Sequence, residues 1–110
     1  MTKWLMIVET NSNDTAREDE FNQWYDQIHL PDVGESPGVV RATRYENTDP
    51  IEGQAKFIAL YEVETDDLEQ TRKAMGENMA KKMAEGRFSE LLEIVGQGTY
   101  KQISAWPEKP

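Results

Sequence analysis

The sequence predicts an α+β fold in which two helices cover one face of a four-stranded antiparallel sheet. Four segments rich in β-branched and aromatic residues and two segments with helical spacing follow one another in the order βαββαβ. The length of 110 residues suits one domain. This element order is that of the ferredoxin-like sandwich. We expect a single domain over residues 1–106 and a C-terminal tail over 107–110.

The four predicted strands differ in their apolar patterns. The first, residues 3–9, is a continuous apolar run, which suits a strand covered on both faces. The second and third, residues 39–46 and 56–64, are separated by a turn-forming stretch and are expected to form a hairpin. The fourth covers residues 94–103. In the third strand, one face carries Phe57, Ala59, Tyr61 and Val63, and the other carries Ile58 and Leu60.

The first predicted helix begins after the polar turn 11–14, which is rich in N-cap residues, and ends near Leu30 because Pro31 disfavours helical geometry in the residue before it. Its inner face has a spacing of three and four residues and consists of Phe21, Trp24, Tyr25 and Ile28.

The second predicted helix begins at Asp66, which has capping-box spacing to Glu69, and ends at Gly86. One side of it carries Leu68, Met75, Met79 and Met83, which we interpret as core packing.

The first and third strands place apolar side chains on both faces of the sheet, although helices cover only one. A solvated second face would be mostly polar. We therefore expect a homodimer in which the second face of one subunit covers the same face of the other.

Composition excludes several classes of function. The net charge of −9, from 21 acidic and 12 basic residues, opposes binding to nucleic acid and to anionic membranes. No apolar run approaches the roughly 20 residues that a membrane span needs, and the N-terminal residues show no signal-peptide pattern, so a cytoplasmic protein is expected. With no cysteine and one histidine, the chain offers no disulfide, no thiolate and no multi-histidine metal site.

His29 is the leading candidate for chemistry because its ordinary pKa, near 6.5, allows proton exchange at neutral pH. Tyr25 lies four residues earlier, so both side chains are expected to face one pocket beneath the helix. Asp26 and Asp32 flank His29 as candidates to orient the imidazole, and Asp26, three residues before it, is within reach. A structural alternative for His29 is an interaction with the carbonyl groups at the helix C-terminus, and for Tyr25 it is core packing.

Other side chains are candidates for substrate binding. Phe21 and Trp24 would serve as pocket walls or as core. Arg44 would bind a substrate carboxylate or pair with a nearby acid, and Arg41 at odd spacing points to the opposite face. Tyr45 and Tyr61 are possible hydrogen-bond donors, as is Tyr100.

Residues 20–32, EFNQWYDQIHLPD, followed by PGVVRATRY at 37–45, resemble the F-x-x-W-Y-x-x-x-H-x-P and P-G signature of EthD-like proteins. These belong to the dimeric α/β-barrel superfamily. The resemblance covers about a quarter of the chain and places the histidine of the motif on His29. It implies a dimer whose two sheets face each other, with a pocket between sheet and helices in each subunit.

Proteins of this superfamily carry out lactone isomerisation, polyketide cyclisation, cyanohydrin cleavage and quinol oxygenation, so the fold does not select a reaction. We expect a lyase, isomerase or cyclase without a cofactor, in which His29 is the general acid or base for a small, largely apolar substrate. The alternatives are a cofactor-free quinol-type monooxygenase and a non-enzymatic accessory or binding protein. Haem degradation is a weaker variant, with His29 as the axial ligand.

Overall fold

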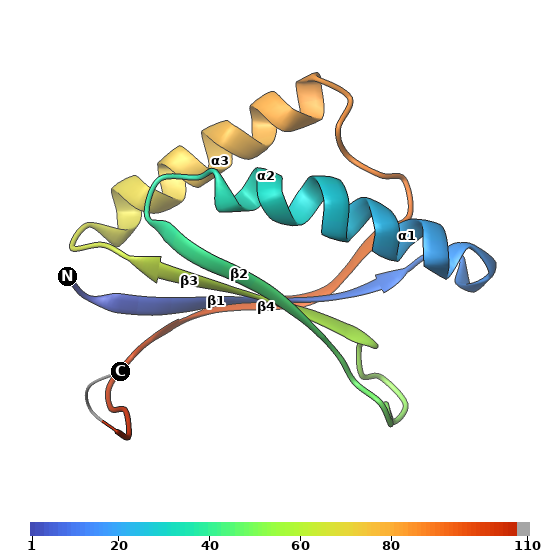
Figure 1. Cartoon of the computed structure of the whole chain (residues 1–110), viewed down its shortest axis with the longest axis horizontal. Helices are drawn as coiled ribbons and strands as arrows, with labels where there is room; N and C mark the ends of the chain where they lie inside the picture. Colours follow the sequence, from blue (N-terminus) through green and yellow to red (C-terminus); the bar gives the residue numbers. More distant parts are fainter. Residues whose placement is uncertain (108–110) are drawn as a thin grey trace.

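The computed structural model describes residues 1–107, and it confirms the ferredoxin-like sandwich (Figure 1). The antiparallel sheet has the order β2-β3-β1-β4, and α1, α2 and α3 lie over one of its faces. The strands are β1 (Lys3–Ser12), β2 (Val39–Glu46), β3 (Phe57–Glu64) and β4 (Leu92–Lys101), and the helices are α1 (Glu18–Trp24), α2 (Leu30–Gly34) and α3 (Leu68–Ala84). In the tail expected over 107–110, residues 108–110 lie outside the described residues.

The outer strand β4 begins and ends two residues before the predicted bounds. β1 continues to Ser12, beyond its predicted end, and its last residues pair with Leu92 to Ile94. A register shift between Glu9 and Thr10 accommodates Val95 as the extra residue of β4. The longer pairing brings the start of β4 beneath the helix layer.

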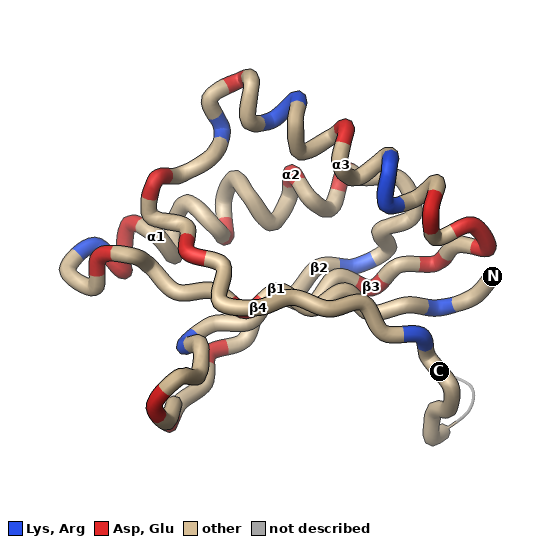
Figure 2. The backbone as a smooth tube through the Cα atoms, turned by 180° about the vertical axis from the view of Figure 1, so that it is seen from behind, with Lys and Arg blue, Asp and Glu red and all other residues tan. Residues whose placement is uncertain are grey.

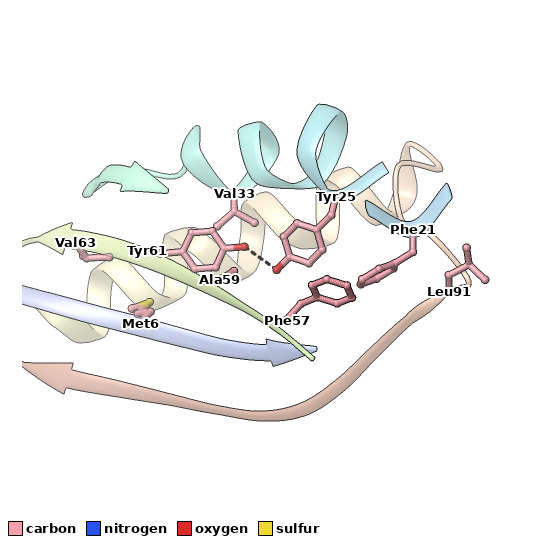
Figure 3. Packing of buried hydrophobic residues seen from close by; sticks show 9 residues of the cluster. All are labelled: Met6, Phe21, Tyr25, Val33, Phe57, Ala59, Tyr61, Val63 and Leu91. Atoms are coloured by element: carbon pink, nitrogen blue, oxygen red, sulfur yellow. Dashed lines mark hydrogen bonds between the residues drawn. The ribbon is translucent and has the colours of Figure 1, made fainter. Parts of the chain in front are cut away.

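The alternation predicted for β3 is confirmed. Its odd-numbered residues are buried beneath the helices, whereas Ile58 and Leu60 lie on the other face and stay partly exposed. Across the sheet, Met6 pairs with Tyr61 on the helix side. Figure 3 shows how this side packs, with Phe21 and Tyr25 descending from the helix towards Phe57 and Tyr61.

The prediction that the first helix ends near Leu30 is wrong. The helix continues from α1 through a π-helical segment, Tyr25–His29, into α2. In this segment the Leu30 N–H donates to the Tyr25 carbonyl five residues earlier, so one extra residue widens the turn. Pro31 then falls in the first turn of α2, where a missing N–H is tolerated, and it does not end the helix.

The start of α3 also differs from the predicted capping box. Asp67 is the N-cap, and its side chain accepts from the Gln70 N–H at 3.1 Å, while Asp66 instead accepts from the Thr2 N–H at 3.0 Å. Gly86 ends the helix with φ of +75°, as expected for a C-cap glycine.

The inner side of α3 is not a closed core. Thr71 is its one buried residue, Met75 and Met79 are half-buried, and Met83 is mostly exposed. α3 crosses above the sheet at an angle (Figure 1). Met75 and Met79 pack against the edge of the core, and together with Met83 they line a cavity. Among residues 1–107, no helix combines the length and the apolar character that a bilayer crossing requires.

Candidate active site

A cavity of about 640 Å³ lies between α3, the π-helical segment and the strands β1 and β4. We call it the helix-side cavity. Its volume falls within the range of about 300–1,000 Å³ that small-molecule sites occupy. Its wall is mostly apolar and consists of Met6, Ile7, Val8, Tyr25, His29, Val33, Tyr61, Arg72, Met75, Met79, Ala80, Met83, Phe88, Leu92, Ile94, Gln97, Gly98 and Thr99.

The His29 side chain lies in this wall among three aromatic rings. Trp24 stacks on the imidazole with ring centroids 4.8 Å apart. Tyr25 and Phe88 approach it edge-on, at centroid distances of 4.8 and 5.2 Å. His29 is 8% exposed, and no group of residues 1–107 forms a hydrogen bond with the imidazole. The imidazole nitrogens are therefore free to bind a molecule in the cavity.

This environment changes the acid–base character expected of His29. Burial lowers the pKa of His29 to about 4, Asp32 partly opposes that shift, and the positive charge of Arg44 adds to it. The imidazole is therefore neutral at neutral pH. It is a proton acceptor there, whereas the ordinary pKa near 6.5 had suggested that it would exchange protons in both directions.

The hydroxyl groups of Tyr25 and Tyr61 lie 3.0 Å apart (Figure 3), and the Tyr25 ring is the one that meets His29 edge-on. One hydroxyl donates to the other, so one phenolic proton of the pair is left for a further acceptor. Burial raises the pKa of both tyrosines, and the hydrogen bond to Tyr61 partly opposes the shift at Tyr25. Both hydroxyls are therefore protonated donors at neutral pH, and both residues line the helix-side cavity.

Arg44 lies outside the cavity wall and ties α1 to β2. Its guanidinium donates to Asp26 at 2.8 Å and to Asn22 at 3.0 Å, and it lies 4.2 Å from the ring centroid of Tyr25. Its side chain is 11% exposed.

The expectation that Asp26 orients the imidazole is wrong, because this carboxylate pairs with Arg44 instead. Arg41 faces the other side of the sheet, as expected, 3.7 Å from Glu62.

The remaining candidates also lie outside the cavity wall. Phe21 is fully buried in the core. Trp24 lies behind His29, and its indole N–H donates to the Arg87 carbonyl at 2.9 Å. Tyr45 is 56% exposed on the opposite face of the sheet. Of the seven predicted site residues, the structure brings Tyr25, His29 and Tyr61 together around one space.

Sequence reasoning missed the loop that closes one side of the site. Asp32 is buried, and both of its carboxylate oxygens accept from Arg87, at 2.7 and 3.0 Å. These hydrogen bonds hold the pKa of Asp32 below its usual value. They also fix the loop that carries Phe88 against His29. This loop has no periodic pattern from which Phe88 could have been selected.

The prediction that the methionines of α3 pack against the core is confirmed for Met75 and Met79, but all three methionines also line the cavity, which was not predicted. Their spacing of four residues gives one helix face, which is what both a core and a cavity wall require. As for metals, no group of three or more His, Cys, Asp or Glu side chains within residues 1–107 is arranged to hold an ion.

Comparison with known proteins supports the fold. No family model matches the chain, and no curated protein sequence matches it significantly. Solved structures do match. HapK from Hahella chejuensis is 18% identical with a TM-score of 0.65, and the match covers 93% of this chain and 94% of HapK. SnoaB from Streptomyces nogalater, a cofactor-independent oxygenase, is 14% identical with a TM-score of 0.63, covering 98% of this chain and 100% of SnoaB.

A protein of the ethyl tert-butyl ether D (EthD) family from Bacillus halodurans is 18% identical with a TM-score of 0.52. The match covers 89% of this chain and 97% of that protein. At these identities the shared property is the fold. The resemblance to EthD-like proteins is therefore confirmed at the level of the ferredoxin-like fold.

The lowered pKa of His29 predicts a pH dependence of stability. An unfolded histidine has a pKa of 6.5 and the folded one about 4, so between these values the unfolded chain binds more protons. The stability associated with the neutral imidazole is complete above pH 6.5 and is lost as the pH falls to 4. From pH 7 to pH 4, urea unfolding of the wild type should therefore lose about 3 kcal/mol more than unfolding of His29→Gln. Equal losses would contradict the shift.

Proposed function

We propose that this protein is an enzyme that removes an acidic proton from a small, largely apolar substrate with a carbonyl or hydroxyl group. His29 is the base, and Tyr25 and Tyr61 bind the oxygen on which charge develops. The aromatic, lactone and polyketide-like compounds are the substrate classes in view, and the reaction is that of a lyase, isomerase or cyclase without a cofactor. The observation that carries this proposal is a neutral imidazole without a hydrogen-bond partner among the described residues, facing an apolar cavity beside a pair of phenolic hydroxyls.

The reaction begins when an imidazole nitrogen lone pair takes a proton from a C–H or O–H bond of the substrate. The electrons of that bond move towards the neighbouring substrate oxygen, which becomes an enolate or phenolate. The tyrosine hydroxyl that is not used within the Tyr25–Tyr61 pair donates to this oxygen. The imidazolium then returns the proton to another atom of the substrate, which completes an isomerisation or cyclisation, or to the leaving carbon of a cleaved bond.

The low basicity of His29 limits the substrates. If the pKa of the base is about 4 and that of the substrate is about 10, proton transfer costs about 8 kcal/mol before any stabilisation of the anion. A simple ketone, whose pKa is far higher, would cost much more. The substrate proton is therefore phenolic, or it lies on a carbon activated by two carbonyl groups. The imidazolium formed is a strong acid in this apolar setting, which favours rapid return of the proton.

A quinol-type monooxygenase is the second candidate. It would use the same first step, after which the electron-rich anion reacts with dioxygen. The likeness of the fold to SnoaB, which is described as a cofactor-independent oxygenase, supports it. A non-enzymatic accessory role would fit a small cavity, or an imidazole that is hydrogen-bonded to the backbone. The cavity volume of about 640 Å³ supports an enzyme instead. So does the imidazole, which has no hydrogen bond within residues 1–107.

The homodimer expected from the sequence is also part of this proposal. The sheet face opposite the helices, which we call the far face, carries Leu5, Ile58 and Leu60 together with Tyr45 and Tyr100. Figure 2 shows that charged residues along the chain concentrate on the helix layer and at the ends of the strands, whereas the middle of the sheet carries few. Two solved proteins of this fold are described as dimeric ferredoxin-like proteins. A second copy would cover this apolar surface.

Proton abstraction is testable without knowing the natural substrate. We expect the wild type to accelerate deuterium exchange from solvent into 1,3-diketones and polyhydroxylated aryl ketones, followed by NMR. His29→Gln should lose about 100-fold or more of this acceleration, as expected for removal of a general base, while circular dichroism stays unchanged. Lys73→Gln, on α3 but outside the cavity wall, should keep full activity. If His29→Gln supports exchange as well as the wild type does, the role of His29 is refuted.

Oxygen uptake with a panel of hydroquinones decides between the two reactions, and no uptake rejects the monooxygenase.

The dimer is testable by sedimentation equilibrium. The wild type should have twice the mass of one chain, and Leu60→Glu should convert it to a monomer because a carboxylate would be buried without a partner between the two far faces. Ile103→Glu, a matched change at a residue that is 92% exposed beyond β4, should remain dimeric. A monomeric wild type would contradict the proposal.

A further inference from the structure

We propose that the substrate carries an anionic group, such as a carboxylate, and that Arg72 binds this group in the helix-side cavity. The inference rests on the helix-side cavity being the substrate site proposed above. It adds a substrate class, that of apolar acids, and assigns a binding role to a residue that had no part in the sequence predictions.

The charge of the cavity wall is the first observation. Among its residues, Arg72 is the only lysine, arginine, aspartate or glutamate. The whole chain has 21 acidic and 12 basic residues, so an acid would be the more frequent charged residue in a randomly chosen wall. Among residues 1–107, the wall instead holds a single cation and no carboxylate. Arg72 is an exposed residue, so its charge gives the solvent-accessible part of an otherwise apolar cavity a positive potential, opposite in sign to the net charge of −9.

The pairing of the arginines is the second observation. The chain has five arginines, and four of them lie within 4.0 Å of a carboxylate: Arg17 beside Glu20 and Glu90, Arg41 beside Glu62, Arg44 beside Asp26 and Arg87 beside Asp32. Arg72 has no carboxylate within that distance among residues 1–107. In a chain so rich in acids, an arginine without one is the exception. Its guanidinium keeps all of its donors for a bound molecule or water.

The far face offers an internal comparison. A hollow of about 610 Å³ there is also lined by basic residues, namely Lys3, Arg41 and Lys101, but Glu62 and Glu64 line the same hollow. Positive and negative charges are mixed on that side, and they are not mixed in the helix-side cavity. The helix-side cavity therefore differs from the hollow on the far face in that the charged side chains lining it, among residues 1–107, have one sign only.

The position of Arg72 suits an extended amphiphilic ligand. Met75 and Met79 follow it by three and seven residues in α3, so the three side chains share one helix face. Gln97 and Thr99 of β4 line the same cavity and supply further polar groups. An acid would place its carboxylate on the planar guanidinium, which binds such groups through two parallel hydrogen bonds. Its apolar part would then extend along the methionines towards His29.

Two fluorescent probes with the same aromatic framework test this recognition. 1-Anilinonaphthalene-8-sulfonate is an anion, and N-phenyl-1-naphthylamine is its neutral counterpart. We expect the wild type to bind the anion more tightly than the neutral probe. Arg72→Gln should weaken binding of the anion about threefold to fivefold, the loss expected for one exposed charged contact, and should change the affinity for the neutral probe less than about 1.5-fold. Lys73→Gln, which removes the same charge one residue away and outside the cavity wall, should change neither affinity.

Several outcomes would overturn the inference. An equal loss for both probes in Arg72→Gln would indicate that the guanidinium stacks on aromatic rings and does not recognise charge. An equal effect of Lys73→Gln would indicate a general effect of net charge, and no binding of the anion would exclude the site. The His29→Gln variant separates this question from the proposed reaction. It should retain the preference for the anion whether or not His29 proves to be the base, because the preference depends on Arg72.

Discussion

The burial of the single imidazole among aromatic rings determines what the helix-side cavity can do. Trp24, Tyr25 and Phe88 surround His29, and no group of residues 1–107 compensates a positive charge on the ring through a hydrogen bond. Such a site disfavours the imidazolium form, so His29 is neutral and free to accept a proton. Because the neutral imidazole is a weak base, the substrate proton that it removes has to be acidic. The same burial keeps Tyr25 and Tyr61 protonated, so they can donate to the substrate.

Two features of the chain produce that burial. The π-helical segment Tyr25–His29 carries the helix past Pro31, so Asp32 becomes buried within α2. Asp32 then binds Arg87 and fixes the loop that places Phe88 on the imidazole. Arg44 holds the other side, since its contacts with Asp26 and the Tyr25 ring join the π-helical segment to β2. Arg44 therefore pairs with a nearby acid, one of the two roles expected for it, and Asp26, which was expected to orient the imidazole, is that acid.

The fold was predictable because alternation and helical spacing depend on burial alone. β2 has the predicted bounds, and the alternation along β3 was read correctly. The end of the first helix was not predictable, because proline usually disfavours helical geometry in the residue before it. Here the widened π turn precedes Pro31, and the helix continues through the proline into α2. Tyr25 and His29 were paired by spacing, but the contact of Tyr61 with Tyr25 needed the sheet register. Arg72 and Phe88 have no sequence signal, since exposure and loop conformation decide their roles.

The state of the imidazole is open to direct measurement, because the chain has one histidine and its ring signals need no assignment by mutation. The account predicts that an NMR titration of the folded protein finds these signals in the neutral form at pH 6, with a midpoint near pH 4. A midpoint near 6.5, the value of a solvated histidine, would contradict it. In that case His29 would be an ordinary titrating group, and the restriction to acidic substrates would no longer hold.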